Sequence, residues 1–260
     1  MPFSIGFDKR NTKIARYSKK QRATIKNKRK NKTKKKDKIV DIPFSKYKSK
    51  GTKATIGNIY FHYQLYSNIN YFFSILNSKL KIKANLNKNH IKLISRGKKL
   101  YHNELPYLDL TKKINLIIID LDTNEGKHAN IAIVNNMKNT IEFYEPHGYR
   151  RNKNSEIAGN KGIYHKKVKL LKEIFENMLP EHSFIDVVSM NPKTSFQTDL
   201  DPEENTGFCV TWCILFVHYR LLNLNILLSR LIKHIDKTMT TTKLLKYAKY
   251  IEDTIKQNLI

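Results

Sequence analysis

The chain has 260 residues, 40% of them hydrophobic, and a formal net charge of +27, which suits one sizeable folded domain with a basic tail. Its two cysteines lie four residues apart in an apolar run, so we expect an intracellular protein without a disulfide framework. We expect neither a secretory signal peptide nor a membrane span, because the apolar segments are too short.

The positive charge is concentrated at the N-terminus. Residues 1–50 hold 19 Lys/Arg and 3 Asp/Glu, net +16, and the rest of the chain carries +11. This segment has almost no apolar content, so we expect a basic disordered arm. Its charge would suit salt-dependent binding to DNA or a localisation signal. Lysine outnumbers arginine 40 to 9, as AT-rich codons would also produce, and both interpretations stay open.

Residues 51–260 are the expected folded domain. The aromatic-rich segment 58–80 has apolar spacing typical of a helix, and residues 90–110 predict short irregular elements. We assign residues 51–110 to an accessory N-terminal portion.

Three strands are predicted in the middle of the chain. Residues 113–122 form a near-continuous apolar run, as in a central strand. Residues 128–136 and 138–148 follow as two further strands, the second closed by Pro146 and Gly148.

Helices dominate the last third of the sequence. Residues 163–180 have the apolar pattern of an amphipathic helix, and residues 183–191 predict a short strand. The polar loop 191–207 then leads to an apolar helix that begins at Cys209, and residues 226–260 predict the C-terminal helices. Strands in the middle and helices on both sides indicate an α+β fold.

The hairpin between the second and third strands places a histidine beside a carboxylate. A turn centred between Asn136 and Met137 pairs residues whose numbers sum to 273, so His128 faces Glu145 on one side of the sheet. The carboxylate would orient the imidazole and raise its basicity. A surface His–Glu cross-strand pair is the alternative.

Cys209 follows a turn signal and opens a helix, where the partial positive charge of the helix N-terminus favours a thiolate. Backbone N–H groups there can point at an oxyanion, and Gln197 upstream offers a further donor. Cys213 lies one turn deeper among apolar residues and is predicted to be structural. The alternative for Cys209 is also a packed core cysteine.

The motifs "HANIAIVNNMKNTIEFYEPHG" (128–148), "FQ" (196–197) and "GFCVTW" (207–212) occur in this order. Their order resembles the superfamily of SUMO and ubiquitin-like-protein proteases, which includes the adenovirus protease, and more closely its divergent members in large DNA viruses. The resemblance covers about residues 110–225, the expected catalytic core.

The resemblance implies a papain-like cysteine protease architecture, in which a central mixed sheet packs against a buried helix that begins at the nucleophile. It implies roles for four residues: Cys209 as nucleophile, His128 as general base, Glu145 as the group that orients the base, and Gln197 as an oxyanion-hole donor.

The sequence departs from the cellular enzymes at several points. Ala129 stands where they usually have Trp, and Phe208 stands where Asp usually precedes the cysteine. The acid is Glu145 where Asp is commoner, and the spacing from Gln197 to Cys209 is longer.

The expected function is therefore a cysteine endopeptidase or isopeptidase that cleaves after small, Gly-type residues. Its substrates would be viral precursors or ubiquitin-like conjugates, inside an infected host cell or in the virion. The alternative is a non-catalytic basic protein, nucleic-acid-binding or virion-associated, including a protease fold that has lost its chemistry. We expect no cofactor and no membrane partner. A metal site from Cys209, Cys213 and His218 is disfavoured, because its surroundings are apolar.

Overall fold

The computed structural model describes residues 38–45, 65–85, 90–96, 99–102, 105–124, 126–148, 161–190, 196 and 208–258. Residues 39–260 form one compact unit.

The described elements are a mixed sheet and five α-helices. The strands are β1 (Ala84–Asn85), β2 (His90–Arg96), β3 (Lys99–His102), β4 (Ile114–Thr123), β5 (Gly126–Asn135), β6 (Thr140–Tyr144) and β7 (Ser183–Asp186). The helices are α3 (Leu65–Leu80), α4 (Lys161–Met178), α6 (Cys209–Leu222), α7 (Leu228–Thr238), α8 (Thr241–Asn258) and the short 3-10 helix η1 (Val188–Met190).

The strands form a single mixed sheet in the order β3-β2-β4-β5-β6-β7, with β1 paired to β4 away from this path. β4, β5 and β6 form an antiparallel meander at its centre. β2 and β7 join it on either side as parallel neighbours of β4 and β6. The expected α+β class with a central mixed sheet is thus what the structure has.

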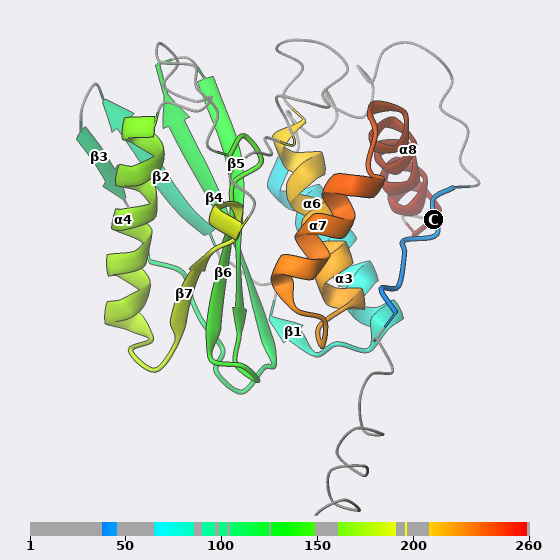
Figure 1. The fold of residues 1–260 in the computed structure, drawn as a ribbon, viewed down its shortest axis with the longest axis horizontal. Helices are drawn as coiled ribbons and strands as arrows, with labels where there is room; N and C mark the ends of the chain where they lie inside the picture. The colour runs from blue at the N-terminus through cyan, green and yellow to red at the C-terminus, as the bar shows by residue number, and fades with distance from the viewer. Residues whose placement is uncertain are drawn as a thin grey trace, which may run out of the picture. The chain divides into compact units, whose positions relative to one another are not determined.

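The sheet separates two cores, because successive side chains of a strand point to opposite faces. Along β5, Ile131 and Ile133 belong to the core shared with α3, α6, α7 and α8. Ala132 and Val134 belong to the core shared with α4. Figure 1 shows α4 on one side of the sheet and α6 with the other helices on the opposite side.

Helix α6 is the central helix of the larger core. Every residue from Cys209 to Leu221 is buried, as expected of a helix that is apolar around its whole circumference. It contacts β5 of the sheet and the helices α3, α7 and α8. The prediction of a buried helix that begins at Cys209 is confirmed.

The predicted strands and helices are found with shifted ends. β4 and α4 lie within two residues of their predicted bounds, and α7 and α8 occupy the predicted C-terminal helical region. The strand predicted at 138–148 ends at Tyr144, because Pro146 and a turn follow. The strand predicted at 183–191 ends at Asp186 and gives way to η1.

The prediction of irregular elements at 90–110 is wrong for its first part. β2 and β3 pair as antiparallel strands, and β2 continues the sheet beside β4. Ile91 and Leu93 alternate with less buried residues and enter the core under α4. This alternation with a period of two residues is typical of a strand and could have predicted β2.

The boundary of the basic arm also needs correction. Ile42 and Phe44, inside the expected arm, are buried in the larger core, and Phe44 contacts Tyr247 of α8 edge to face. Asn223 exchanges hydrogen bonds with the backbone of Val40. Residues 1–37 and 46–50 lie outside the described residues, so disorder of the arm stays a prediction there. In the part of the chain that is described, no helix has the length and hydropathy needed to cross a bilayer.

Candidate active site

His128 and Glu145 meet at one end of the sheet, near the start of β5 and just after the end of β6. His128 Nε2 lies 2.5 Å from Glu145 Oε1, and both side chains are buried. The predicted contact between imidazole and carboxylate is therefore present.

The strand register behind this contact differs from the expected one. Paired residues of β5 and β6 sum to 275, not 273, as Asn135 opposite Thr140 shows. The centre of the hairpin thus lies one residue further along the chain than expected, between Met137 and Lys138. Continued past Tyr144, this register places His147 opposite His128, and Glu145 reaches the imidazole diagonally. A shift of two residues keeps the same face of a strand, which is why the contact survives.

Glu145 is held at both carboxylate oxygens. Oε1 accepts hydrogen bonds from His128 Nε2 and from the backbone N–H of His147, at 2.5 and 3.0 Å. Oε2 is bonded to the ammonium group of Lys167. Burial alone would raise the pKa of Glu145, but the positive charges of His128 and Lys167 hold it well below its usual range.

His128 is bonded to Cys209 as well as to Glu145. Burial alone would lower the pKa of His128. The negative charge of Glu145 and the side-chain hydrogen bond to Cys209 outweigh burial and raise it to about 9. Because Glu145 occupies Nε2, Nδ1 is the nitrogen through which the imidazole can bond to the thiol.

Cys209 stands at the first position of α6. Phe208, which precedes it, has no polar side chain to cap the helix. The partial positive charge of the helix N-terminus therefore acts near the sulfur. A thiol placed there, with an imidazole as its hydrogen-bond partner, meets the requirements for an activated nucleophile.

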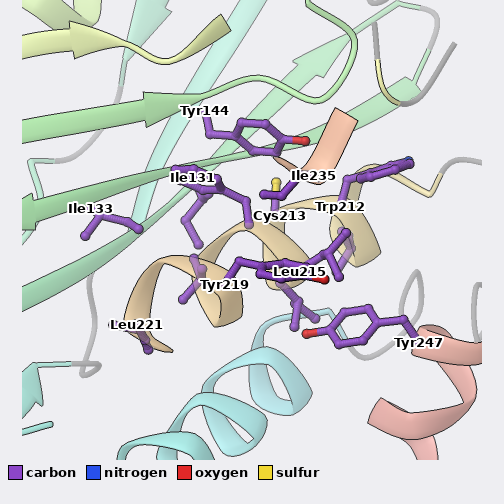
Figure 2. Packing of buried hydrophobic residues seen from close by; sticks show 14 of the residues in the cluster. Ile131, Ile133, Tyr144, Trp212, Cys213, Leu215, Tyr219, Leu221, Ile235 and Tyr247 are labelled. Atoms are coloured by element: carbon purple, nitrogen blue, oxygen red, sulfur yellow. The ribbon is translucent and has the colours of Figure 1, made fainter. Parts of the chain in front are cut away.

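The two cysteines differ in their partners and not in their burial. Cys209 and Cys213 are 2% and 3% exposed. Cys213 donates to the carbonyl of Ala129, and burial raises the pKa of its thiol well above the usual value. Figure 2 shows its sulfur directed toward the sheet, where Ile131 and Tyr144 lie. Its packing agrees with the structural role predicted for it.

Two polar residues of this site were missed in the sequence. Lys167 of α4 is buried and bonds to Glu145 and to the side-chain oxygen of Asn130. A signal existed, because Lys167 precedes the buried residues Leu171 and Phe175 by four and eight positions. It therefore lies on the apolar stripe of the helix.

His147 was also missed. Its ring lies 4.5 Å, centroid to centroid, from the ring of His128 and tilted by 36°. Burial and the nearby positive charge of His128 lower the pKa of His147 to about 3, so it is neutral at physiological pH. It covers His128 with an uncharged ring.

Gln197, the expected oxyanion donor, lies outside the described residues. Its neighbour Phe196 is described and buried, with its ring 5.4 Å from that of Trp212. Among the described residues, no group of three or more His, Cys, Asp or Glu side chains could hold a metal ion.

Comparisons with known proteins are sparse. No family profile matches the chain. A protein of Acanthamoeba polyphaga mimivirus that bears the name of an ankyrin repeat protein is 24% identical over 193 residues. The match covers 68% of this chain but only 25% of that protein, so the chain spans about a quarter of its length.

A solved structure that matches part of this chain is that of the Chlamydia trachomatis effector protein Cdu1 bound to ubiquitin. The match has 10% sequence identity and a TM-score of 0.37. It covers 56% of this chain and 63% of the other.

Proposed function

We propose that this protein is a cysteine peptidase in which Cys209 is the nucleophile, His128 the general base and Glu145 the group that orients the base. One observation carries the proposal: His128 is bonded at the same time to a buried carboxylate and to the thiol that opens helix α6. Buried polar groups of opposite role rarely converge in this way without a function.

The proposed reaction has two steps. His128, whose pKa is about 9, already holds the thiol proton on Nδ1 at neutral pH. In acylation, Cys209 Sγ forms a bond to the substrate carbonyl carbon. The carbonyl π electrons move to oxygen, then return as the C–N bond breaks, and the imidazolium gives its proton to the leaving amine. In deacylation, a water molecule attacks the thioester carbon while His128 takes its proton. The C–S bond then breaks and releases the acid and the thiolate.

The oxyanion would lie at the N-terminus of α6, where backbone N–H groups and the helix dipole favour negative charge. Gln197 is the further donor that we assign to this position, from its place in the sequence order. Glu145 would stay ionised throughout and stabilise the imidazolium that forms on His128.

The substrate class follows from the sequence resemblance. We assign to the protein an extended substrate chain with a small, Gly-type residue before the scissile bond. The substrate is either a viral precursor or a ubiquitin-like conjugate. We place the reaction inside an infected host cell, in the cytoplasm, virus factory or nucleus, or in the virion.

Covalent trapping tests this proposal. The protein is incubated with ubiquitin-like and Gly-Gly peptide probes that carry a thiol-reactive C-terminus, and the adduct is mapped by mass spectrometry. We expect an adduct on Cys209 that is lost in Cys209→Ser and reduced at least about 100-fold in His128→Ala. The matched control is Cys213→Ser, which should keep the adduct. No adduct with any probe, together with salt-sensitive DNA binding, would favour the non-catalytic basic protein instead.

A further inference from the structure

Lys167 is a charged residue in a place where charge is costly. Its side chain is 2% exposed, and it lies on the apolar stripe of α4. An ammonium group taken out of water is retained only when charged and polar partners compensate for its lost hydration. The role of Lys167 can therefore be inferred from the groups that bind its ammonium group.

Those partners connect Lys167 to the proposed catalytic residues. Its ammonium group bonds to Glu145 Oε2 and, at 2.9 Å, to Asn130 Oδ1. Asn130 is itself buried on β5, two residues after His128. The ammonium group thus bridges the strand that carries the imidazole and the carboxylate that orients it.

We propose that Lys167, held in place by Asn130, is a positioning residue that stabilises ionised Glu145 together with His128, keeps it turned toward His128 and shares the charge of that carboxylate. The inference deepens the proposed function and rests on it. Lys167 would touch neither the substrate nor the reacting atoms and would act through Glu145.

The electrostatics of the cluster support this role. A buried carboxyl group without a cation would tend to take up a proton, and Lys167 opposes this beside His128. Other titratable groups also interact with Glu145 or His128. They are His147, Asp186, Cys209 and Cys213.

Lys167 also sets how strongly Glu145 holds the proton on His128. With the ammonium group present, the carboxylate charge is divided between two cations. Without it, the whole charge acts on the imidazole, which then binds its proton more tightly. A general base must release that proton in each catalytic cycle. Lys167 would therefore keep the pKa of His128 low enough for the proton to be released.

The test is the titration of His128, followed by NMR in wild-type protein and in Lys167→Met. We expect its pKa to rise by about one unit in the variant. Lys167→Arg, which keeps the charge, should restore most of the wild-type value. Lys172→Met removes a half-exposed lysine of the same helix, paired with Glu176 at 3.5 Å, and should leave the titration unchanged. An unchanged or lowered pKa of His128 in a folded Lys167→Met would overturn the proposal.

A second measurement needs no variant and can still overturn the proposal if Lys167→Met does not fold. In wild-type protein, the carboxyl carbon of Glu145, observed by NMR, should keep the chemical shift of a carboxylate down to about pH 4. Titration of Glu145 at or above the usual range of glutamic acid would overturn the role of Lys167.

Activity separates this inference from the proposed function. Lys167→Met should lower kcat, shift the basic limb of its pH profile upward and leave KM nearly unchanged, because the lysine acts on the base and not on the substrate. If wild-type protein cleaves no substrate, the proposed function fails while the His128 titration still tests Lys167. If wild-type protein is active and the pH profile of Lys167→Met is unchanged, only the role of Lys167 fails.

Discussion

The side chain of Glu145 is the point on which the site depends. It joins His128, Lys167 and the backbone of His147 through its two oxygens. Its charge therefore controls both the orientation of the base and the stability of the cation behind it.

Replacing Glu145 with Gln tests this directly. The loss of the negative charge should lower the pKa of His128 from about 9 by more than about one unit. It should also reduce the free energy of unfolding by about 3–5 kcal/mol, because buried Lys167 loses its counter-charge. Histidine NMR and denaturant unfolding measure the two effects.

The matched control is Glu176→Gln, a half-exposed carboxylate on α4. Its replacement should change stability by less than about 1 kcal/mol. Equal effects of the two substitutions would contradict the account of Glu145.

At this scale, the sequence identified some residues of the site and not others. His128, Glu145 and Cys209 were found because their chain order and spacing carry a motif. The observed strand register differs from the predicted one by two residues, so His128 and Glu145 still lie on the same face of the sheet. Lys167 was missed because a lysine on a helix is normally solvent-exposed, and only its position on the apolar stripe distinguishes it. Gln197 lies outside the described residues and stays a prediction.

Among the elements, α6 is fixed to the sheet at both ends. Its first residue bonds to His128. Near its last turn, Arg220 forms two hydrogen bonds of 2.7 Å with Glu142 of β6, and both side chains are buried. Arg220 also donates to the carbonyl groups of Asn223 and Ile226 that follow the helix. This bidentate pair sets the position of α6 along β6.

Arg220→Met should therefore be strongly destabilising. It leaves the carboxylate of Glu142 buried without its cation, which costs about 3–5 kcal/mol in the free energy of unfolding. Denaturant unfolding followed by circular dichroism measures it. Lys169→Met, which breaks an exposed ion pair with Glu173, should cost less than about 1 kcal/mol. A small loss in Arg220→Met would mean that the pair does not fix the helix.

The elements themselves were largely predictable from periodicity. β4 and α6 are apolar almost throughout, and α4 has a regular apolar stripe, so pattern alone defines them. β2 and β3 were missed because both runs are short and Gly97 with further basic residues lies between them. Their place in the sheet depends on the pairing of β3 with β2 and of β2 with β4, which no local pattern contains.

For the whole molecule, the neutral histidines His147 and His218 contribute to how stability responds to acid. Burial lowers the pKa of His218 and of His147 to about 3. In the unfolded chain both would titrate near 6.5. Between these values the unfolded state binds more protons than the folded state, so stability falls as pH decreases.

We expect the free energy of unfolding to decrease from about pH 6.5 toward pH 3, each histidine contributing about 1.4 kcal/mol per pH unit. His218→Gln should flatten this dependence, because glutamine can still bond to Tyr247, as Nδ1 of His218 does at 3.1 Å. The control is His102→Gln at an exposed position, which should leave the pH dependence of the free energy of unfolding unchanged. Denaturant unfolding at a series of pH values provides the measurement, and identical slopes in wild type and His218→Gln would refute the assignment.

The central claim is that His128 activates Cys209 and not Cys213. The most direct test is the rate of alkylation of each cysteine at pH 7 by a small neutral reagent, resolved by peptide mass spectrometry in wild-type protein and in His128→Ala. We predict that Cys209 reacts at least about 10-fold faster in wild type than in the variant, whereas folded Cys213 stays unmodified in both. Equal rates at the two cysteines, or a rate at Cys209 that does not depend on His128, would contradict the claim.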